Sequence, residues 1–273
     1  MFEYREYAPP DDLADTVRCI WFLAAAPGAG APQRILPDGC AEVVFNFADR
    51  FEELGAGTAH AQPAQLVVGP SSRHMLIRPT GAVDLAGVRF HPGGAAAFLT
   101  CRLAELSDRT AGLGETRSRL DHSLWERMAT ARTGPERRDA LLAGLRRAHR
   151  PATVDRRVVG ARRLLAAAEG RLTMDELVRA TGISARTLER LFDRTVGMPP
   201  KRLARLERFQ AVLRRARHGT KTSGLREAAL AAGYFDQAHF LREFHAFAGV
   251  SPSTFYGCED NEMSGAFTGG AHA

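Results

Sequence analysis

The stretches TMDELVRATGISARTLERLFDRTVGMPPK (residues 173–201) and LREAALAAGYFDQAHFLREFHAFAGVSPSTFY (residues 225–256) decide the fold of the C-terminal part of this chain. In each, a segment with apolar side chains at helical spacing leads to a glycine, and a second such segment carries polar and Arg side chains on its other face. This is the helix-turn-helix pattern, in which the second helix enters the major groove of DNA. The duplication predicts one domain that presents two such helices.

The first copy carries clear helix start and stop signals. Thr173 and Glu176 fit a capping box, in which each side chain accepts a hydrogen bond from the other residue's backbone amide, so a helix is expected from Met174. Gly182 permits the sharp turn because glycine takes a positive φ without steric cost. Ser184 is placed to cap the second helix, whose inward side chains are expected to be Leu188, Leu191, Phe192 and Val196.

The second copy repeats this plan. Gly233 is expected to make the turn, Asp236 to cap the second helix and Gly249 to end it. Ser251 followed by Pro252 predicts a short final helix. The core-facing residues of the second helix are predicted to be Phe240, Phe244 and Phe247.

A connecting helix is predicted between the copies, over residues 200–217. Its length would be about 27 Å at roughly 1.5 Å per residue. Arg190 and Arg242, which occupy corresponding places in the two motifs, are 52 residues apart. Such a helix is long enough to hold their segments about one duplex turn, roughly 34 Å, apart, so that one chain contacts two successive major-groove segments.

Charge is divided unevenly along the 273 residues. Residues 1–154 hold 18 Lys and Arg against 18 Asp and Glu, whereas residues 155–257 hold 19 against 10. Residues 258–273 hold three acidic side chains and no Lys or Arg, and are expected to form a flexible acidic tail. A basic segment joined to a neutral one indicates that the basic segment alone meets a polyanion.

The first hundred residues predict a β-rich domain. Short β-rich runs separated by Gly and Pro turns occur at residues 18–23, 34–36, 42–47, 65–68, 75–78 and 83–90. The absence of helix-length segments between them favours a small barrel or sandwich over an α/β sheet. With the helical C-terminal domain, the fold class expected for the whole chain is α+β, with a small cupin-like β-barrel at the N-terminus.

A helical annex is expected to follow the β domain. Residues 94–101, 104–110, 124–132 and 135–149 have helical patterns, and Leu141, Leu142 and Leu145 form an apolar stripe that must be covered. The β domain or a second copy of the chain would cover it, the latter giving a homodimer. The expected organisation is therefore residues 1–100 as a sensor-like domain, 101–154 as annex and linker, 155–257 as the DNA-binding domain and 258–273 as the tail.

The C-terminal region of about 100 residues resembles the AraC/XylS class of bacterial transcription regulators, through both motifs, their spacing and the closing segment GVSPSTFY. The resemblance implies no enzymatic activity and places the base-contacting positions on Arg186, Glu189, Arg190, Gln237, Ala238, His239, Leu241 and Arg242. Arg suits guanine and Gln suits adenine. The sequence departs from the class at Pro199-Pro200, where a Ser-Pro pair is usual, so a hydroxyl cap is lost there.

The N-terminal segment resembles the sensor-like domain of one subgroup of these regulators, through LPDGCAEVVFNF (residues 36–47), LVVGP (66–70) and VDLAGVRFHPGGAAAFL (83–99). The resemblance implies a domain that binds an effector or mediates association. Because the neutral and the basic parts of the chain meet at residues 140–155, this connection is expected to be the element through which an effector controls DNA binding. Candidate ligand-binding residues near predicted strand ends are Arg34, Asp38, Glu42 and Arg89. The expected partners are double-stranded DNA, a small-molecule effector and, for an activator, RNA polymerase.

Other chemistry has weaker support in the sequence. Cys19, Cys40, Cys101 and Cys258 form no CxxC pair, which favours free thiols. His60, His74, His91 and Cys40 lack the close pairing of a metal site, and no cofactor motif is present, so neither a metal nor a cofactor is expected. The alternatives are a DNA-repair or thiol-reactive enzyme or sensor using Cys40, and a constitutive binder with little sequence preference. The lack of a signal peptide or a membrane-length apolar run predicts a cytoplasmic protein.

Overall fold

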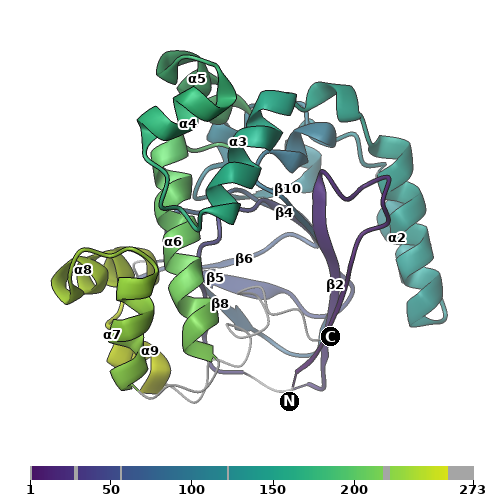
Figure 1. Cartoon of the computed structure of the whole chain (residues 1–273). Coiled ribbons are helices and arrows are strands. Elements are labelled where there is room, and N and C mark those ends of the chain that lie inside the picture. The colour runs from purple at the N-terminus through teal and green to yellow at the C-terminus, as the bar shows by residue number, and fades with distance from the viewer. Residues whose placement is uncertain (1, 28–29, 56, 122, 218–221, 258–273) are drawn as a thin grey trace.

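The computed structural model describes residues 2–27, 30–55, 57–121, 123–217 and 222–257. The expected acidic tail, including Cys258, lies outside the described residues. The N-terminal part is built on two β-sheets and the C-terminal part on helices (Figure 1), so the α+β class is confirmed.

Two antiparallel sheets form the β domain. The six-stranded sheet has the order β1 (Glu3–Tyr7), β2 (Val17–Ala25), β9 (Val83–Phe90), β4 (Glu42–Asn46), β7 (Gln65–Val68) and β10 (Thr110–Gly112). The four-stranded sheet has the order β3 (Gln33–Ile35), β8 (Met75–Pro79), β5 (Phe51–Leu54) and β6 (Ala59–Ala61). All six predicted strands are present, and β7 and β9 have the predicted bounds.

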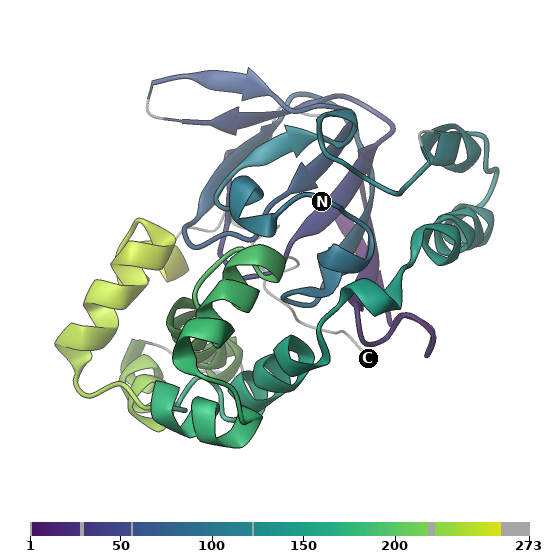
Figure 2. The same cartoon turned by 90° about the horizontal axis from the view of Figure 1, so that it is seen from above.

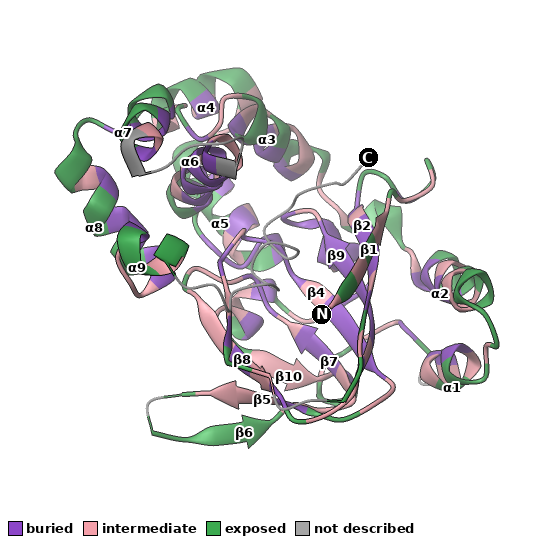
Figure 3. Ribbon diagram, turned by 90° about the horizontal axis from the view of Figure 1, so that it is seen from below, coloured by how far each residue is buried: buried purple, intermediate pink, exposed green. Residues whose placement is uncertain are grey.

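The closed barrel predicted for this domain is wrong, because the two sheets remain separate and open. The reason lies in the central strands β4 and β9, where consecutive residues, whose side chains point to opposite faces, are nearly all buried (purple in Figure 3). Trp21, Val44 and Leu66 pack between the sheets against Phe51 and Ile77 of the smaller sheet. The opposite face packs against the helical annex through a second cluster that includes Val43, Phe45, Val88 and Phe90. An antiparallel sheet covered on both faces does not need closure to bury its apolar side chains.

The annex contains two α-helices, α1 (Ser123–Ala129) and α2 (Gly134–Ala148). The helices predicted over 94–101 and 104–110 are absent, and the chain instead forms the 3₁₀ turns η1 (Gly94–Ala97) and η2 (Leu103–Leu106) before β10. Leu99 pairs with Ser118 in an isolated bridge, and Asp108 has a φ of 56°, which interrupts a helix. Two more short turns follow, η3 (Leu113–Glu115) and η4 (Pro151–Thr153).

The apolar stripe of α2 is covered within the chain. Leu141 and Leu145 are fully buried in the cluster on the annex face of the large sheet, and Leu142 packs at its edge. Of the two interpretations left open by the sequence, intrachain packing is the one observed.

The C-terminal domain consists of seven helices over the described residues 156–257: α3 (Arg156–Ala167), α4 (Met174–Thr181), α5 (Ala185–Thr195), α6 (Pro200–Arg217), α7 (Thr222–Ala231), α8 (Gln237–Ala248) and α9 (Pro252–Gly257). The helix predicted over residues 200–217 has those bounds in α6, which runs between the α4–α5 pair and the α7–α8 pair (Figure 1). One core cluster includes Leu188, Phe192, Phe209, Phe240 and Phe244, so both motifs pack on the same connecting helix. Within the described part of the chain, no helix combines the length and apolarity required to cross a bilayer.

Candidate nucleic-acid interface

Capping residues fix where the two helices of the first motif, α4 and α5, begin and where α4 ends. The Thr173 hydroxyl accepts from the Glu176 amide at 3.3 Å, and the Glu176 carboxylate accepts from the Thr173 amide at 2.8 Å. Gly182 ends α4 with a φ of 69°, and the Ser184 hydroxyl accepts from the Thr187 amide at 3.3 Å. The predicted capping box, turn and cap are confirmed, and they set the direction in which α5 leaves the turn.

The outer face of α5 carries the side chains predicted to contact DNA. Leu188 and Phe192 are buried in the core, whereas Arg186, Glu189 and Arg190 are exposed. Because side chains three and four positions apart share a helix face, these three polar groups form one outward surface. The surface faces away from the core cluster and is open to a ligand.

In the second motif, α8 is bounded in the same way, by a capping side chain at its start and a glycine at its end. The Asp236 carboxylate accepts from the His239 amide at 2.6 Å, and Gly249 ends the helix in the left-handed conformation with a φ of 71°. The predicted cap and stop are confirmed, and the inward side chains are buried as predicted: Phe240, Phe244 and Phe247.

Four of the five α8 residues predicted to contact DNA are exposed: Gln237, Ala238, Leu241 and Arg242. His239 differs because it is only partly exposed and its ring lies 5.2 Å from that of Tyr234. Its Nε2 atom is 3.9 Å from the buried carboxylate of Glu243. The imidazole therefore packs along the helix instead of standing outward with its four neighbours.

A cationic groove borders α8. It has a volume of about 750 Å³ and runs along α6 from the start of α4, with Leu165, Leu172 and Leu177 among its apolar walls. Its basic side chains are Arg171, Lys201, Arg205, Arg208 and Arg242, and the acidic side chain among the lining residues is Glu243, which pairs with Arg205. A groove of this charge beside a recognition helix suits the sugar-phosphate backbone of DNA.

The β domain docks directly on the C-terminal domain through the loop that precedes β4. Leu36 belongs to the C-terminal core cluster. Gly39 has a φ of 74°, and a Cβ atom there would lie 2.9 Å from Leu203 of α6. The buried Gln210 side chain of α6 donates to the Pro37 carbonyl at 2.7 Å. We refer to residues 36–40 as the docking loop.

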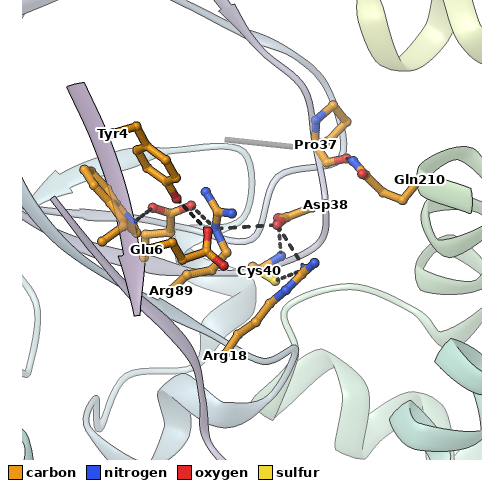
Figure 4. Close-up of polar contacts among 10 residues, drawn as sticks. Tyr4, Glu6, Arg18, Pro37, Asp38, Cys40, Arg89 and Gln210 are labelled. Carbon is orange, nitrogen blue, oxygen red and sulfur yellow. Dashed lines mark hydrogen bonds and ion pairs between the residues drawn. The ribbon is translucent and has the colours of Figure 1, made fainter. Parts of the chain in front are cut away.

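A buried polar cluster supports the docking loop from the β domain (Figure 4). Arg89 Nε lies 2.7 Å from Glu42 Oε1 and 3.7 Å from Asp38 Oδ2, and Arg18 donates to Asp38 at 3.4 Å. The Trp21 indole donates to the second Glu42 oxygen at 3.0 Å. Burial raises the pKa of the Glu42 carboxyl, and the Arg89 charge opposes that rise.

The structure thus brings together three of the four candidate ligand residues, Asp38, Glu42 and Arg89, where they pair with one another. Arg34 lies elsewhere and donates to the Ala248 carbonyl, at the C-terminal end of α8, at 2.7 Å. Nearby, the His74 amide donates to the Phe247 carbonyl at 2.8 Å. The β domain therefore also holds the C-terminal end of the second recognition helix.

Three residues that the structure brings to attention were not identified from the sequence: Arg18 and Gln210 at the domain contact, and the exposed Phe235 before α8. Arg18 and Gln210 join groups that are far apart in the chain, so local pattern gives no signal for them. Phe235 had a usable signal, because only one of two adjacent aromatics can face the core at a turn. Tyr234 takes that place with 3% exposure, and Phe235 is 88% exposed.

The Cys40 thiol does not have the environment of a reactive cysteine. Its side chain is buried, and burial raises its pKa well above the ordinary value, although Arg18 and Arg89 act in the opposite direction. A nucleophilic cysteine requires a thiolate and access. Cys19 and Cys101 are also free thiols. Among the residues that the structure describes, no three His, Cys, Asp or Glu side chains gather as a metal site would require.

Two family models match the chain, one over each part. The family model described as "Helix-turn-helix domain" matches residues 177–256, from α4 to α9. The model described as "Domain of unknown function (DUF6597)" matches residues 5–112, from β1 to β10. No curated protein matches the chain.

Solved structures of ToxT from Vibrio cholerae are similar to this chain at low identity. Apo ToxT K231A has 10% identity and a TM-score of 0.45, with 93% of this chain and 96% of that chain covered. A second ToxT structure has 7% identity and a TM-score of 0.46, with 93% and 97% covered. Wild-type ToxT bound to an unsaturated fatty acid has 10% identity and a TM-score of 0.43, with 93% and 94% covered.

Proposed function

We propose that this chain, whose C-terminal domain is a helix-turn-helix domain of the AraC type, regulates transcription by binding a specific DNA sequence with both motifs of one polypeptide. The observation that carries the proposal is the shared core. α5 and α8 pack on the same helix, α6, while their polar outer faces are exposed. Helices fixed to one support approach a duplex as a unit, so the energetic cost of ordering them is met on folding.

The contacts divide between the two helices. Arg186 and Arg190 of α5 are proposed to bind guanine O6 and N7, with Glu189 orienting them. Gln237 and Arg242 of α8 are proposed to contact adenine and guanine, beside Ala238 and Leu241. His239 is proposed to position α8 through its contacts with Tyr234 and Glu243.

Control of this activity is proposed to come from the N-terminal domain. A cavity of about 70 Å³ lies between the two sheets, with mostly apolar walls that include Trp21, Phe51 and Ile77, and with Glu42 in its lining. Trp21 and Glu42 also belong to the polar cluster that supports the docking loop on α6. Because a ligand the size of benzene needs an apolar cavity of about 150 Å³, a small apolar effector would bind an arrangement in which this cavity is wider. Its higher affinity for that arrangement would shift the balance between the two.

The test is selection of a duplex by the full chain from a random pool, followed by competition with a scrambled duplex at matched salt. We expect the selected duplex to bind about 10³-fold or more tightly than the scrambled one. Equal affinity for the two would contradict the proposal and indicate a binder without sequence preference. Chromosomal mapping of bound sites in the parent cell then identifies the promoters concerned.

A further inference from the structure

The two recognition helices present different chemistry. The outer face of α5 is formed by Arg186, Glu189 and Arg190. On α8 the exposed face includes Ala238 and Leu241, and Leu241 is 41% exposed. Phe235, in the turn directly before the Asp236 cap, is 88% exposed. The second motif thus offers an apolar surface where the first offers charge.

This apolar surface lies where a recognition helix meets base edges. Ala238 and Leu241 are three residues apart, so they lie on the same face of α8. Phe235 directly precedes the Asp236 cap, so its exposed ring lies in the turn at the N-terminal end of that helix. In helix-turn-helix proteins the N-terminal residues of the recognition helix contact the bases. The apolar group that base pairs display in the major groove is the C5-methyl of thymine.

We propose that Phe235, Ala238 and Leu241 contact thymine methyl groups, so that the second motif selects A·T pairs next to the guanine contacted by Arg242, whereas the first motif selects guanine through Arg186 and Arg190. This inference rests on the proposed function. DNA is favoured over a protein partner because the apolar surface is bordered by Gln237 and Arg242, and the cationic groove continues from Arg242 along α6. A surface so bordered complements a polyanion, with apolar contact confined to the base edges.

The experiment uses the duplex selected by the full chain and two versions of it. In one, deoxyuridine replaces every thymidine in the segment protected by the second motif; in the other, the replacement is in the segment protected by the first. Uracil keeps the Watson–Crick edge of thymine and lacks only the methyl group. We expect the first replacement to weaken binding about fourfold per contacted methyl, the factor for roughly 0.8 kcal/mol per buried carbon. The second replacement should change binding far less.

Variants assign the effect to side chains. Leu241→Ala and Phe235→Ala should bind the thymidine and deoxyuridine duplexes with more similar affinities than the parent protein does. Leu230→Ala is the matched control, because Leu230 is 48% exposed but belongs to α7, and it should keep the full difference. The Leu241, Phe235 and Leu230 side chains are all exposed, so circular dichroism should show that each of the three variants is folded.

Three results would overturn the inference. The first is equal affinity of the parent protein for the thymidine duplex and for the duplex with deoxyuridine in the segment of the second motif. The second is that Leu241→Ala and Phe235→Ala keep the parent's full difference in affinity between these two duplexes. The third is that these variants bind DNA as the parent does but change the association of the chain with a second protein, which would make the apolar surface a protein contact. Failure to select any duplex would instead contradict the proposed function itself.

Discussion

Arg190 and Arg242 hold corresponding places on α5 and α8, and both side chains are exposed on the side of the helix opposite a buried phenylalanine, Phe192 or Phe244. We expect Arg190→Ala and Arg242→Ala each to weaken binding to the selected duplex by about 1–3 kcal/mol while the protein stays folded. The measurement is fluorescence anisotropy with selected and scrambled duplexes. Arg147→Ala removes the same charge from the exposed surface of α2 and should have little effect. Undiminished selectivity in both recognition-helix variants would show that the contact assignment is wrong.

His91 makes stability depend on pH. Burial, together with the charges of Arg162 and Arg18, lowers the pKa of His91 to about 3. In the unfolded chain the imidazole takes up a proton near its ordinary pKa of about 6.5, so the unfolded state binds more protons as the pH falls. Above about pH 6.5 the protonation of His91 therefore does not change the free energy of unfolding. Between about pH 6.5 and about pH 3 it lowers that free energy progressively as the pH falls.

Urea unfolding at about pH 7.5 and about pH 5 measures this contribution. We expect His91 to cost the native protein about 2 kcal/mol at the lower pH, on the order set by 1.36 kcal/mol per pKa unit. His91→Asn should lack this part of the loss. If the variant and the parent lose the same free energy over this interval, His91 is not the group responsible.

The sequence predicts the boundary residues of the C-terminal helices because their signals are local. Thr173, Ser184 and Asp236 each bond an amide within three positions, and Gly182 and Gly249 take the left-handed φ that ends a helix. No such signal marks the polar cluster, where Arg89 joins Glu42 across 47 positions. Which polar residues meet there depends on strand pairing, specifically on β4 lying beside β9.

At the level of elements, α6 links the two motifs and also contacts the docking loop of the β domain. Gln210 is 5% exposed, and its amide donates to the Pro37 carbonyl across the domain boundary. Gln210→Ala should destabilise the protein by about 1–3 kcal/mol, because the buried carbonyl loses its partner. The matched substitution Gln237→Ala removes the same group from the exposed face of α8 and should change stability by less than about 0.5 kcal/mol.

Chemical denaturation of the two variants tests this contrast. Equal stability of Gln210→Ala and the parent would mean that the docking loop does not depend on this bond. DNA binding should follow the opposite order, with Gln237→Ala weakening selective binding by about 1–3 kcal/mol.

Strands that the sequence analysis missed share a physical cause. β1 (EYREY) lies at a sheet edge and has three charged residues among its five, and β5 carries Glu52 and Glu53. All three residues of β6 are exposed, so burial leaves no apolar pattern to detect. The sequence held a signal against the barrel that was predicted. In the run AEVVFNF, successive residues are apolar at VVF, which is typical of a strand covered on both faces.

At the level of the whole molecule, the helical domain lies along one side of the sheets and the α1–α2 pair on another (Figure 2). This docking was not predictable, because Gln210 and Pro37 are 173 positions apart and neither belongs to a recognisable motif. The charge partition was predictable from composition, and it falls on the domain that carries both recognition helices.

The charge partition implies steep salt dependence of DNA binding. Each phosphate neutralised by the protein contributes a slope of about −0.9 to the dependence of log K on log salt concentration. Lys201 is exposed in the groove beside α8, so Lys201→Ala should reduce the magnitude of the slope by about 1 and weaken selected and scrambled duplexes alike. Arg147→Ala should leave the slope unchanged. A slope near zero in the parent protein would contradict a phosphate-contacting groove.

Hydroxyl-radical footprinting of one chain on the selected duplex tests most directly whether a single polypeptide places two helices on one face of DNA. We expect a one-to-one complex with two protected segments on that face, centred about 10 base pairs apart. Arg190→Ala should reduce protection in one segment and Arg242→Ala in the other. A single protected segment, or two segments that appear only when two chains bind, would contradict the account.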